Sequence, residues 1–145
     1  MSYTGRCACG AISAAIDAEP VAVRQCWCRQ CQQLAGGGAS TNAMFSTESM
    51  TLDGDLSWHS YIAASGNTIY HGFCAGCGTP VLGYSSARPQ FRAFRVGFLD
   101  EPHGLRPQMA IWTDDAPDWA VIDPALEQFP RQPPPPAVPL SPGSN

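Results

Sequence analysis

The sequence predicts a mainly β protein built from short strands, with little helix. The 145 residues include 14 glycines and 14 prolines, and this much Gly and Pro favours short strands joined by turns over long helices. No segment keeps the 3.6-residue apolar periodicity that a helix of several turns would need. Hydrophobic residues make up 44% of the chain, and a chain of this length can bury one hydrophobic core.

The first half of the chain contains three expected strands and one short helix. Residues 11–17 alternate weakly and predict a strand that ends before Pro20. Residues 21–26 predict a second strand, and residues 41–45 a third. Between them, residues 29–34 predict a helical turn that stops at three consecutive glycines. These glycines either let a ligand approach the backbone closely or form a flexible loop.

The second half is expected to contain only strands and turns. Asp53-Gly54-Asp55 and Ser65-Gly66-Asn67 are typical turn sequences. Strands are expected over residues 58–62, 68–73, 79–84, 91–97, 108–112 and 119–122. Residues 74–78 then form the tip of a hairpin, where Gly78 suits a positive-φ turn.

The last residues differ from the rest in composition. Seven of the 14 prolines fall within residues 130–145, and such a segment forms neither a sheet ladder nor a helix. We therefore expect a single domain over residues 1–130, followed by an extended, mobile tail over residues 131–145.

Charge and hydropathy exclude several classes of protein. Eight basic against twelve acidic residues give a net charge of −4, which argues against a nucleic-acid-binding protein. No apolar run approaches the length of a membrane span. The N-terminal residues lack the apolar core of a secretory signal, so we expect a protein of the reducing cytoplasm.

Seven cysteines carry the main functional signal, and all of them fall in three tight clusters: Cys7 and Cys9; Cys26, Cys28 and Cys31; Cys74 and Cys77. An odd number of cysteines without a signal peptide argues against a disulfide framework. Thiols two or three residues apart can point at one soft metal ion, for which zinc is the default.

The count of seven favours one site of four cysteines and one of three. Structural zinc sites use four protein ligands, whereas catalytic sites use three and keep one position open. The two pairs then form the closed site, and Cys26, Cys28 and Cys31 form the open one. Two alternatives remain. A single zinc could be held by Cys7 and Cys9 with part of the trio, as we call Cys26, Cys28 and Cys31, or Cys74 and Cys77 could form a redox-active pair.

Three motifs resemble the glutathione-dependent formaldehyde-activating enzyme family. They are Gly5-Arg6-Cys7-Ala8-Cys9-Gly10, Cys26-Trp27-Cys28-Arg29-Gln30-Cys31-Gln32 and Phe73-Cys74-Ala75-Gly76-Cys77-Gly78-Thr79-Pro80. The segment from Val96 to Pro102 and the later Pro107, Trp119 and Phe129 also fit, so the resemblance covers residues 3–130. One departure is Met109-Ala110-Ile111, where family members often have a histidine.

The resemblance implies a zinc fold of stacked antiparallel sheets. It implies a structural zinc on Cys7, Cys9, Cys74 and Cys77, and a catalytic zinc on Cys26, Cys28 and Cys31. The implied activity is that of a carbon–sulfur lyase, which joins glutathione to formaldehyde or a related small aldehyde. Partners would then be a small thiol and a small aldehyde, with no nucleic acid or membrane.

A few other side chains could take part. His59 and His71 are candidate acids, and Arg24 and Arg29 could balance the charge of the trio or hold a glutathione carboxylate. Trp27 either lines the pocket or belongs to the core, and Trp58, Trp112 and Trp119 are expected in the core. The alternative function is a non-catalytic binding module in which both zinc ions only stabilise the fold. A fourth protein ligand to the trio would favour that alternative.

Overall fold

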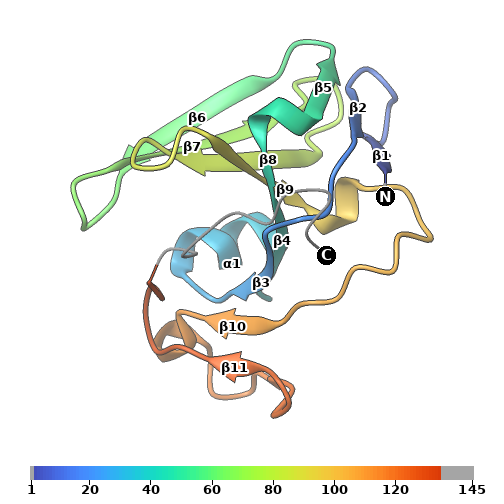
Figure 1. Cartoon of the computed structure of the whole chain (residues 1–145). Coiled ribbons are helices and arrows are strands. Elements are labelled where there is room, and N and C mark those ends of the chain that lie inside the picture. Colours follow the sequence, from blue (N-terminus) through green and yellow to red (C-terminus); the bar gives the residue numbers. More distant parts are fainter. Residues whose placement is uncertain (1, 135–145) are drawn as a thin grey trace.

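The computed structural model describes residues 2–134, which form two β-sheets and one short α-helix (Figure 1). The smaller sheet is antiparallel and has the strand order β1-β2-β5. Its strands are β1 (Tyr3–Arg6), β2 (Ser13–Ile16) and β5 (Met50–Asp53).

The larger sheet contains eight strands in the order β11-β10-β3-β4-β9-β8-β7-β6. These strands are β3 (Ala22–Cys26), β4 (Ser40–Ser46), β6 (Ser57–Ile62), β7 (Thr68–Phe73), β8 (Pro80–Ser85), β9 (Phe91–Arg95), β10 (Met109–Ile111) and β11 (Glu127–Gln128). Neighbours pair antiparallel from β3 to β6, whereas β10 runs parallel to both β3 and β11. Three 3-10 helices, η1 (Thr47–Ser49), η2 (Val96–Phe98) and η3 (Thr113–Asp115), lie between strands.

The two faces of the large sheet have different partners. Side chains alternate between the faces along each strand, and one face packs with the small sheet into the main core. That core includes Val23, Phe45, Leu82 and Phe94 of the large sheet together with Ile16 of the small one. Phe45 and Phe94 have no exposed surface, so they lie at the centre of this core.

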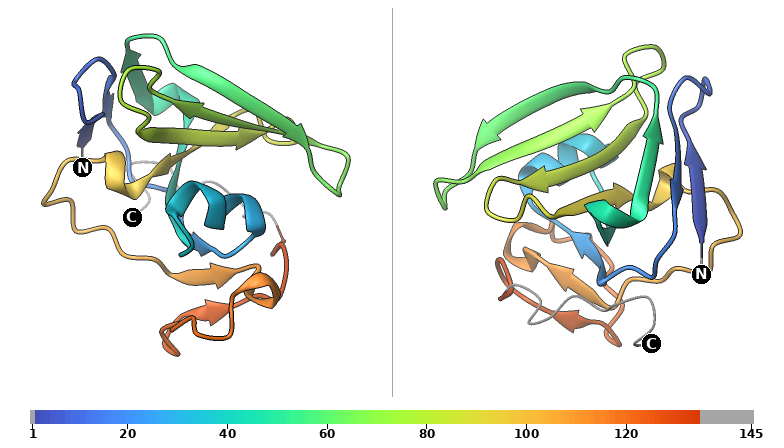
Figure 2. Two further views of the ribbon diagram at one scale, coloured as in Figure 1. Left: turned by 180° about the vertical axis from the view of Figure 1, so that it is seen from behind. Right: turned by 45° about the horizontal axis from the view of Figure 1, so that its top comes forward.

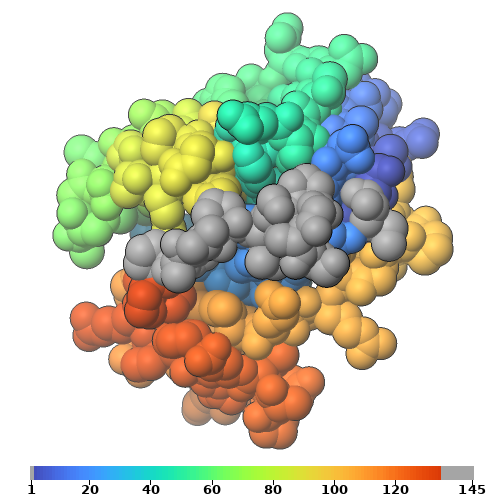
Figure 3. Space-filling view, in the orientation of Figure 1, coloured from blue at the N-terminus to red at the C-terminus, as the bar shows by residue number. Residues whose placement is uncertain are grey.

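The helix α1 (Arg29–Ala35) lies on the other side of the large sheet. Figures 1 and 2 show it between the β6–β7 hairpin and β10, so the sheet curls around it. Gly36 ends the helix with a positive φ of 74°, which glycine adopts at little cost. In the space-filling view, β10 and β11 form the lower end of the molecule, away from β1 and β2 (Figure 3).

The predicted mainly β fold is confirmed, but several elements differ from the prediction. Residues 119–122 form no strand, and the last strand is β11 instead. The side chains of Trp58 and Trp119 are 48% and 66% exposed, so their assignment to the core was wrong. None of the described helices is long and apolar enough to cross a membrane. The part of the predicted tail beyond Pro134 lies outside the described residues.

Candidate metal centres

The first and third cysteine pairs meet at one end of the molecule. Their four sulfurs lie within 4.8 Å of one another, and Cys9 Sγ lies 3.7 Å from both Cys7 Sγ and Cys74 Sγ. These separations are too long for a disulfide, whose sulfurs are about 2.05 Å apart. They match the spacing of about 3.8 Å that two thiolates have on a tetrahedral zinc with Zn–S bonds of about 2.3 Å.

Each pair is held by a tight turn that ends in glycine. Gly10 and Gly78 have φ values of 83° and 77°, a conformation that side chains with a Cβ rarely adopt. The amide of Ile12 donates to Cys7 Sγ at 3.2 Å, and Thr79 Oγ1 lies 3.1 Å from Cys77 Sγ. Such contacts orient sulfurs toward a shared centre and stabilise thiolates.

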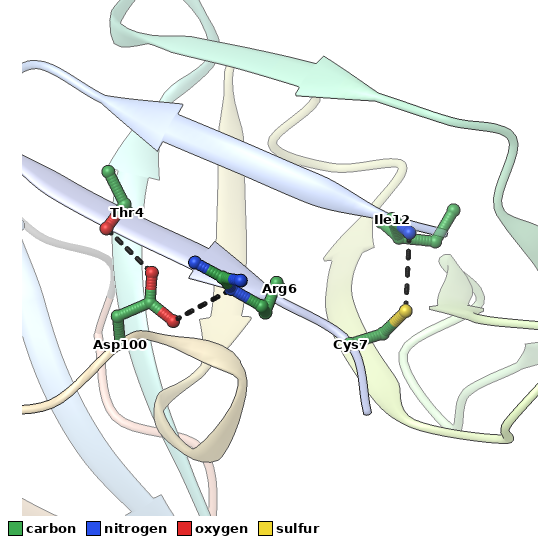
Figure 4. A network of polar contacts seen from close by, with 5 residues as sticks. All are labelled: Thr4, Arg6, Cys7, Ile12 and Asp100. Carbon is green, nitrogen blue, oxygen red and sulfur yellow. Dashed lines mark hydrogen bonds and ion pairs between the residues drawn. The ribbon is translucent and has the colours of Figure 1, made fainter. Parts of the chain in front are cut away.

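The turn of the first pair is fixed to a distant segment (Figure 4). Thr4 Oγ1 donates to an Asp100 carboxylate oxygen at 2.8 Å, and Arg6 Nε lies 3.8 Å from the other oxygen. Figure 4 also shows the Ile12 amide pointing at Cys7 Sγ. The exposed ion pair adds little stability, but together these contacts hold β1 beside the segment that follows η2.

Cys26, Cys28 and Cys31 meet where β3 passes into α1. Cys26 is the last residue of the strand, Cys28 caps the helix, and Cys31 lies in its first turn. The amide of Cys31 donates to Cys28 Sγ at 3.4 Å. The three sulfurs lie within 4.8 Å of one another, and no histidine, aspartate or glutamate among the described residues joins them.

The three thiols of this cluster interact strongly. Hydrogen bonds with the thiols of Cys28 and Cys31 raise the pKa of Cys26. Hydrogen bonds from Cys26 and Cys28 lower the pKa of Cys31, and Ser40 and the charge of Arg95 lower it further. The pKa of Cys28 is raised to about 11, so without a metal the cluster favours a single thiolate, on Cys31, which its two neighbours stabilise by hydrogen bonds.

Arg95 is the main functional residue that sequence reasoning missed. It lies at the end of β9, opposite Asn42 of β4, and its Nη1 donates to Asn42 Oδ1 at 2.6 Å. Its Nε is buried without a hydrogen-bond partner among the described residues. Gly83 makes room for the guanidinium, because a Cβ on Gly83 would lie 2.8 Å from Arg95 Nη2. Strand alternation could have placed Arg95 opposite the core face, but not beside the cysteines.

The two predicted histidines share this face of the sheet. His59 and His71 are direct cross-strand partners on β6 and β7. Together with Tyr61, they form one wall of a pocket of about 190 Å³, and α1 forms the other. Burial and the charge of Arg95 lower the pKa of His71 to about 4. Burial and the nearby cysteines raise the pKa of Tyr61 to about 12, so both side chains are neutral at pH 7.

The remaining candidates lie in different surroundings. Arg24 is half-buried, lies two residues before Cys26 on β3, and its pKa is lowered by burial. Arg29 is exposed and donates to Gln32 Oε1 at 3.0 Å. Trp27 is buried, which favours a place in the core over a place in the pocket wall. Gln32 holds α1 in place, because its Nε2 donates to the carbonyl oxygens of Trp27 and Asp115.

Both clusters fit zinc by the chemistry of their donors. Each offers only thiol sulfurs, which zinc binds readily as thiolates, and the sulfurs converge on one point in each cluster. Among the described residues, Cys7 and Cys9 do not group with Cys26, Cys28 or Cys31. The geometry therefore does not support the alternative of a single zinc shared by the first pair and the trio.

Comparison with known proteins identifies the family. The family model for the glutathione-dependent formaldehyde-activating enzyme matches residues 2–115. A crystal structure of a Rhodobacter sphaeroides protein, solved as a structural genomics target, shares 21% identity with a TM-score of 0.54. The match covers 72% of this chain and 91% of that one, and at this identity it shows the fold alone. No curated protein matches the chain significantly. The chain belongs to the glutathione-dependent formaldehyde-activating enzyme family.

Proposed function

We propose that this member of the family is a carbon–sulfur lyase that forms or breaks a thiol–aldehyde adduct at Cys26, Cys28 and Cys31. Its thiol would be glutathione or a similar small thiol, and its aldehyde would be formaldehyde or a related small aldehyde. Cys7, Cys9, Cys74 and Cys77 would hold a second, structural zinc. Free thiols in both clusters suit a reducing compartment such as the cytoplasm.

The observation that carries the proposal is the difference between the two clusters. One gathers four sulfurs, whereas the other gathers three, and no further metal-binding side chain among the described residues joins the three. Four protein ligands are typical of structural zinc, and three with an open position are typical of catalytic zinc. A zinc ion there would supply Lewis acidity and a free coordination position, which lowers the pKa of an entering thiol.

The surrounding side chains would bind and orient the two reactants. The guanidinium of Arg95 offsets the negative charge of three thiolates. Neutral His71 and Tyr61 can each donate a hydrogen bond to the aldehyde oxygen at neutral pH, while the proton released by the thiol ends on that oxygen. The amides of Gln30 and Gln33 line the same pocket and suit the peptide groups of glutathione.

Turnover measurements test this proposal. Adduct formation from glutathione and formaldehyde would be followed with the zinc-loaded wild type, with Cys28→Ser, and with Cys77→Ser as the matched control in the other cluster. We expect wild-type catalysis above the spontaneous rate, its loss in Cys28→Ser, and its retention in Cys77→Ser molecules that remain folded. A wild type that never exceeds the spontaneous rate would instead support the non-catalytic binding module.

A further inference from the structure

A second, larger pocket of about 360 Å³ lies between α1, β4, β9 and η2. Leu34 lines both pockets and thus separates this one from the pocket of the histidines. The other apolar walls come from Ala35 and Ala39, from Pro80 at the start of β8, and from Gly97 and Phe98 of η2, and the polar residues Ser40, Thr41, Thr79 and Arg95 complete the lining. Because apolar residues make up most of the lining, we call it the apolar pocket.

The apolar pocket adjoins the end of β3 that carries the cysteine cluster. Ser40 lines the pocket and is the cross-strand partner of Cys26, the last residue of β3. Leu34 follows Cys31 by one helical turn, so both face the same side of α1. A thiol–aldehyde adduct formed at Cys26, Cys28 and Cys31 could therefore extend into the apolar pocket.

One charged group faces this apolar space. Arg95 lines the pocket, and its Nε is buried without a partner among the described residues. A buried donor left unpaired is costly, so this nitrogen suits a ligand oxygen. Arg95 pairs with Asn42 of β4, two residues from Ser40, the cross-strand partner of Cys26, so an oxygen held by Arg95 would lie on the side of the pocket toward the cysteines.

The size of the apolar pocket does not suit formaldehyde. Formaldehyde carries only hydrogens on its carbonyl carbon, whereas pockets of several hundred Å³ typically enclose whole organic groups. Filling such a space with apolar atoms gains free energy in proportion to the area removed from water. The pocket thus selects for a substituent that formaldehyde lacks.

We propose that the apolar pocket binds the alkyl or aryl substituent of a larger aldehyde, with Arg95 facing the aldehyde oxygen. This inference rests on the proposed function, since it names the aldehyde class of the same site. In the reaction, the thiol sulfur bonds to the carbonyl carbon, the carbonyl π electrons move to oxygen, and the thiol proton ends on that oxygen. No other reactant is needed, and the reverse reaction releases thiol and aldehyde.

Binding of unreactive analogues tests the pocket without turnover. In S-alkylglutathiones, the carbon on sulfur replaces the former carbonyl carbon, and the rest of the alkyl chain replaces its substituent. Isothermal titration of the zinc-loaded protein should show tighter binding by about fourfold for each added methylene, or about 60-fold from S-methyl to S-butyl. An affinity that stays flat across this series would overturn the inference.

A pocket-filling variant locates the effect. Gly97 has open space around it, since an added Cβ would meet no atom within 4 Å, so Gly97→Leu should fold and occupy the pocket. It should weaken S-butylglutathione binding about tenfold and leave S-methylglutathione within about twofold. Ala35→Leu, from the opposite wall, should act similarly, whereas Ala64→Leu in the exposed β6–β7 turn should change neither affinity.

The remaining outcomes separate this inference from the proposed function. Chain-length-dependent binding without turnover of any aldehyde would refute the enzyme but keep the pocket. Turnover of formaldehyde at least as efficient as that of butanal would refute the pocket but keep the enzyme. A length dependence seen only with free alkanethiols would assign the pocket to the chain of the thiol, and would also overturn the inference.

Discussion

Replacing Gly83 with alanine tests how Arg95 is held beside the three-cysteine cluster. The new Cβ would lie 2.8 Å from Arg95 Nη2 and 3.0 Å from the carbonyl oxygen of Tyr70. The second contact involves backbone of the neighbouring strand β7 and cannot be relieved by a rotamer change. Overpacking of this kind costs about 1–3 kcal/mol, and alanine in a strand regains roughly 0.5–1 kcal/mol over glycine. We therefore expect a net loss of about 1–2 kcal/mol in the free energy of unfolding.

Urea denaturation of the zinc-loaded protein measures this loss, and Gly38→Ala is the matched control. A Cβ on Gly38 would meet nothing within 4 Å, so that variant should be neutral or up to about 1 kcal/mol more stable. In an Arg95→Ala background, the penalty of Gly83→Ala should shrink by at least about 0.5 kcal/mol, because one of the two contacts is gone. Equal effects of Gly83→Ala and Gly38→Ala would refute the packing of Arg95 against Gly83.

Two further predictions concern stability. Trp27 is 6% exposed and Trp119 is 66% exposed, so Trp27→Ala should cost about 3–5 kcal/mol and Trp119→Ala less than about 0.5 kcal/mol, both measured by urea denaturation; similar costs would contradict the assigned burial. The pKa of His71 is lowered from 6.5 to about 4, so the unfolded chain binds more protons between these values, and the contribution of His71 to stability is lost as pH falls through that window. His71→Gln should therefore lose less stability between pH 6.5 and pH 4 than the wild type does, and parallel pH profiles would count against a buried neutral imidazole.

The three cysteine clusters could be predicted because each depends on local spacing, since thiols two or three residues apart can point at one ion. The joining of the first pair with Cys74 and Cys77, about 65 residues away, followed instead from the count of seven and from the family resemblance, and the structure gathers the sulfurs as four and three. The helical turn after Cys28 was also predictable from local sequence, because the glycines that follow it mark its end. The metals in these clusters stay a prediction.

Arg95 and Tyr61 could not be predicted, because they reach the cluster only through strand order. Arg95 lies on β9, and Tyr61 lies on β6 at the far edge of the same sheet. Alternation along each strand predicts which side chains share a face, but it does not reveal which strands are neighbours. The apolar pocket depends on the same order, because β4, β8 and η2 meet there.

The first and last strands were missed for a different reason. β1 has four residues and includes a glycine, and β11 has only two, both polar. Neither carries a local strand pattern. Contacts with distant segments stabilise them instead, such as the bond from the Phe129 amide to the Ala110 carbonyl at 2.9 Å.

Whether the two cysteine clusters each hold one zinc ion can be measured by native mass spectrometry of freshly purified, reduced protein. Two zinc ions are expected per wild-type chain, and one in Cys28→Ser with the structural cluster still protected from alkylation. A wild type with a single zinc, in which Cys26, Cys28 and Cys31 react freely with an alkylating agent, would show that these three cysteines hold no zinc.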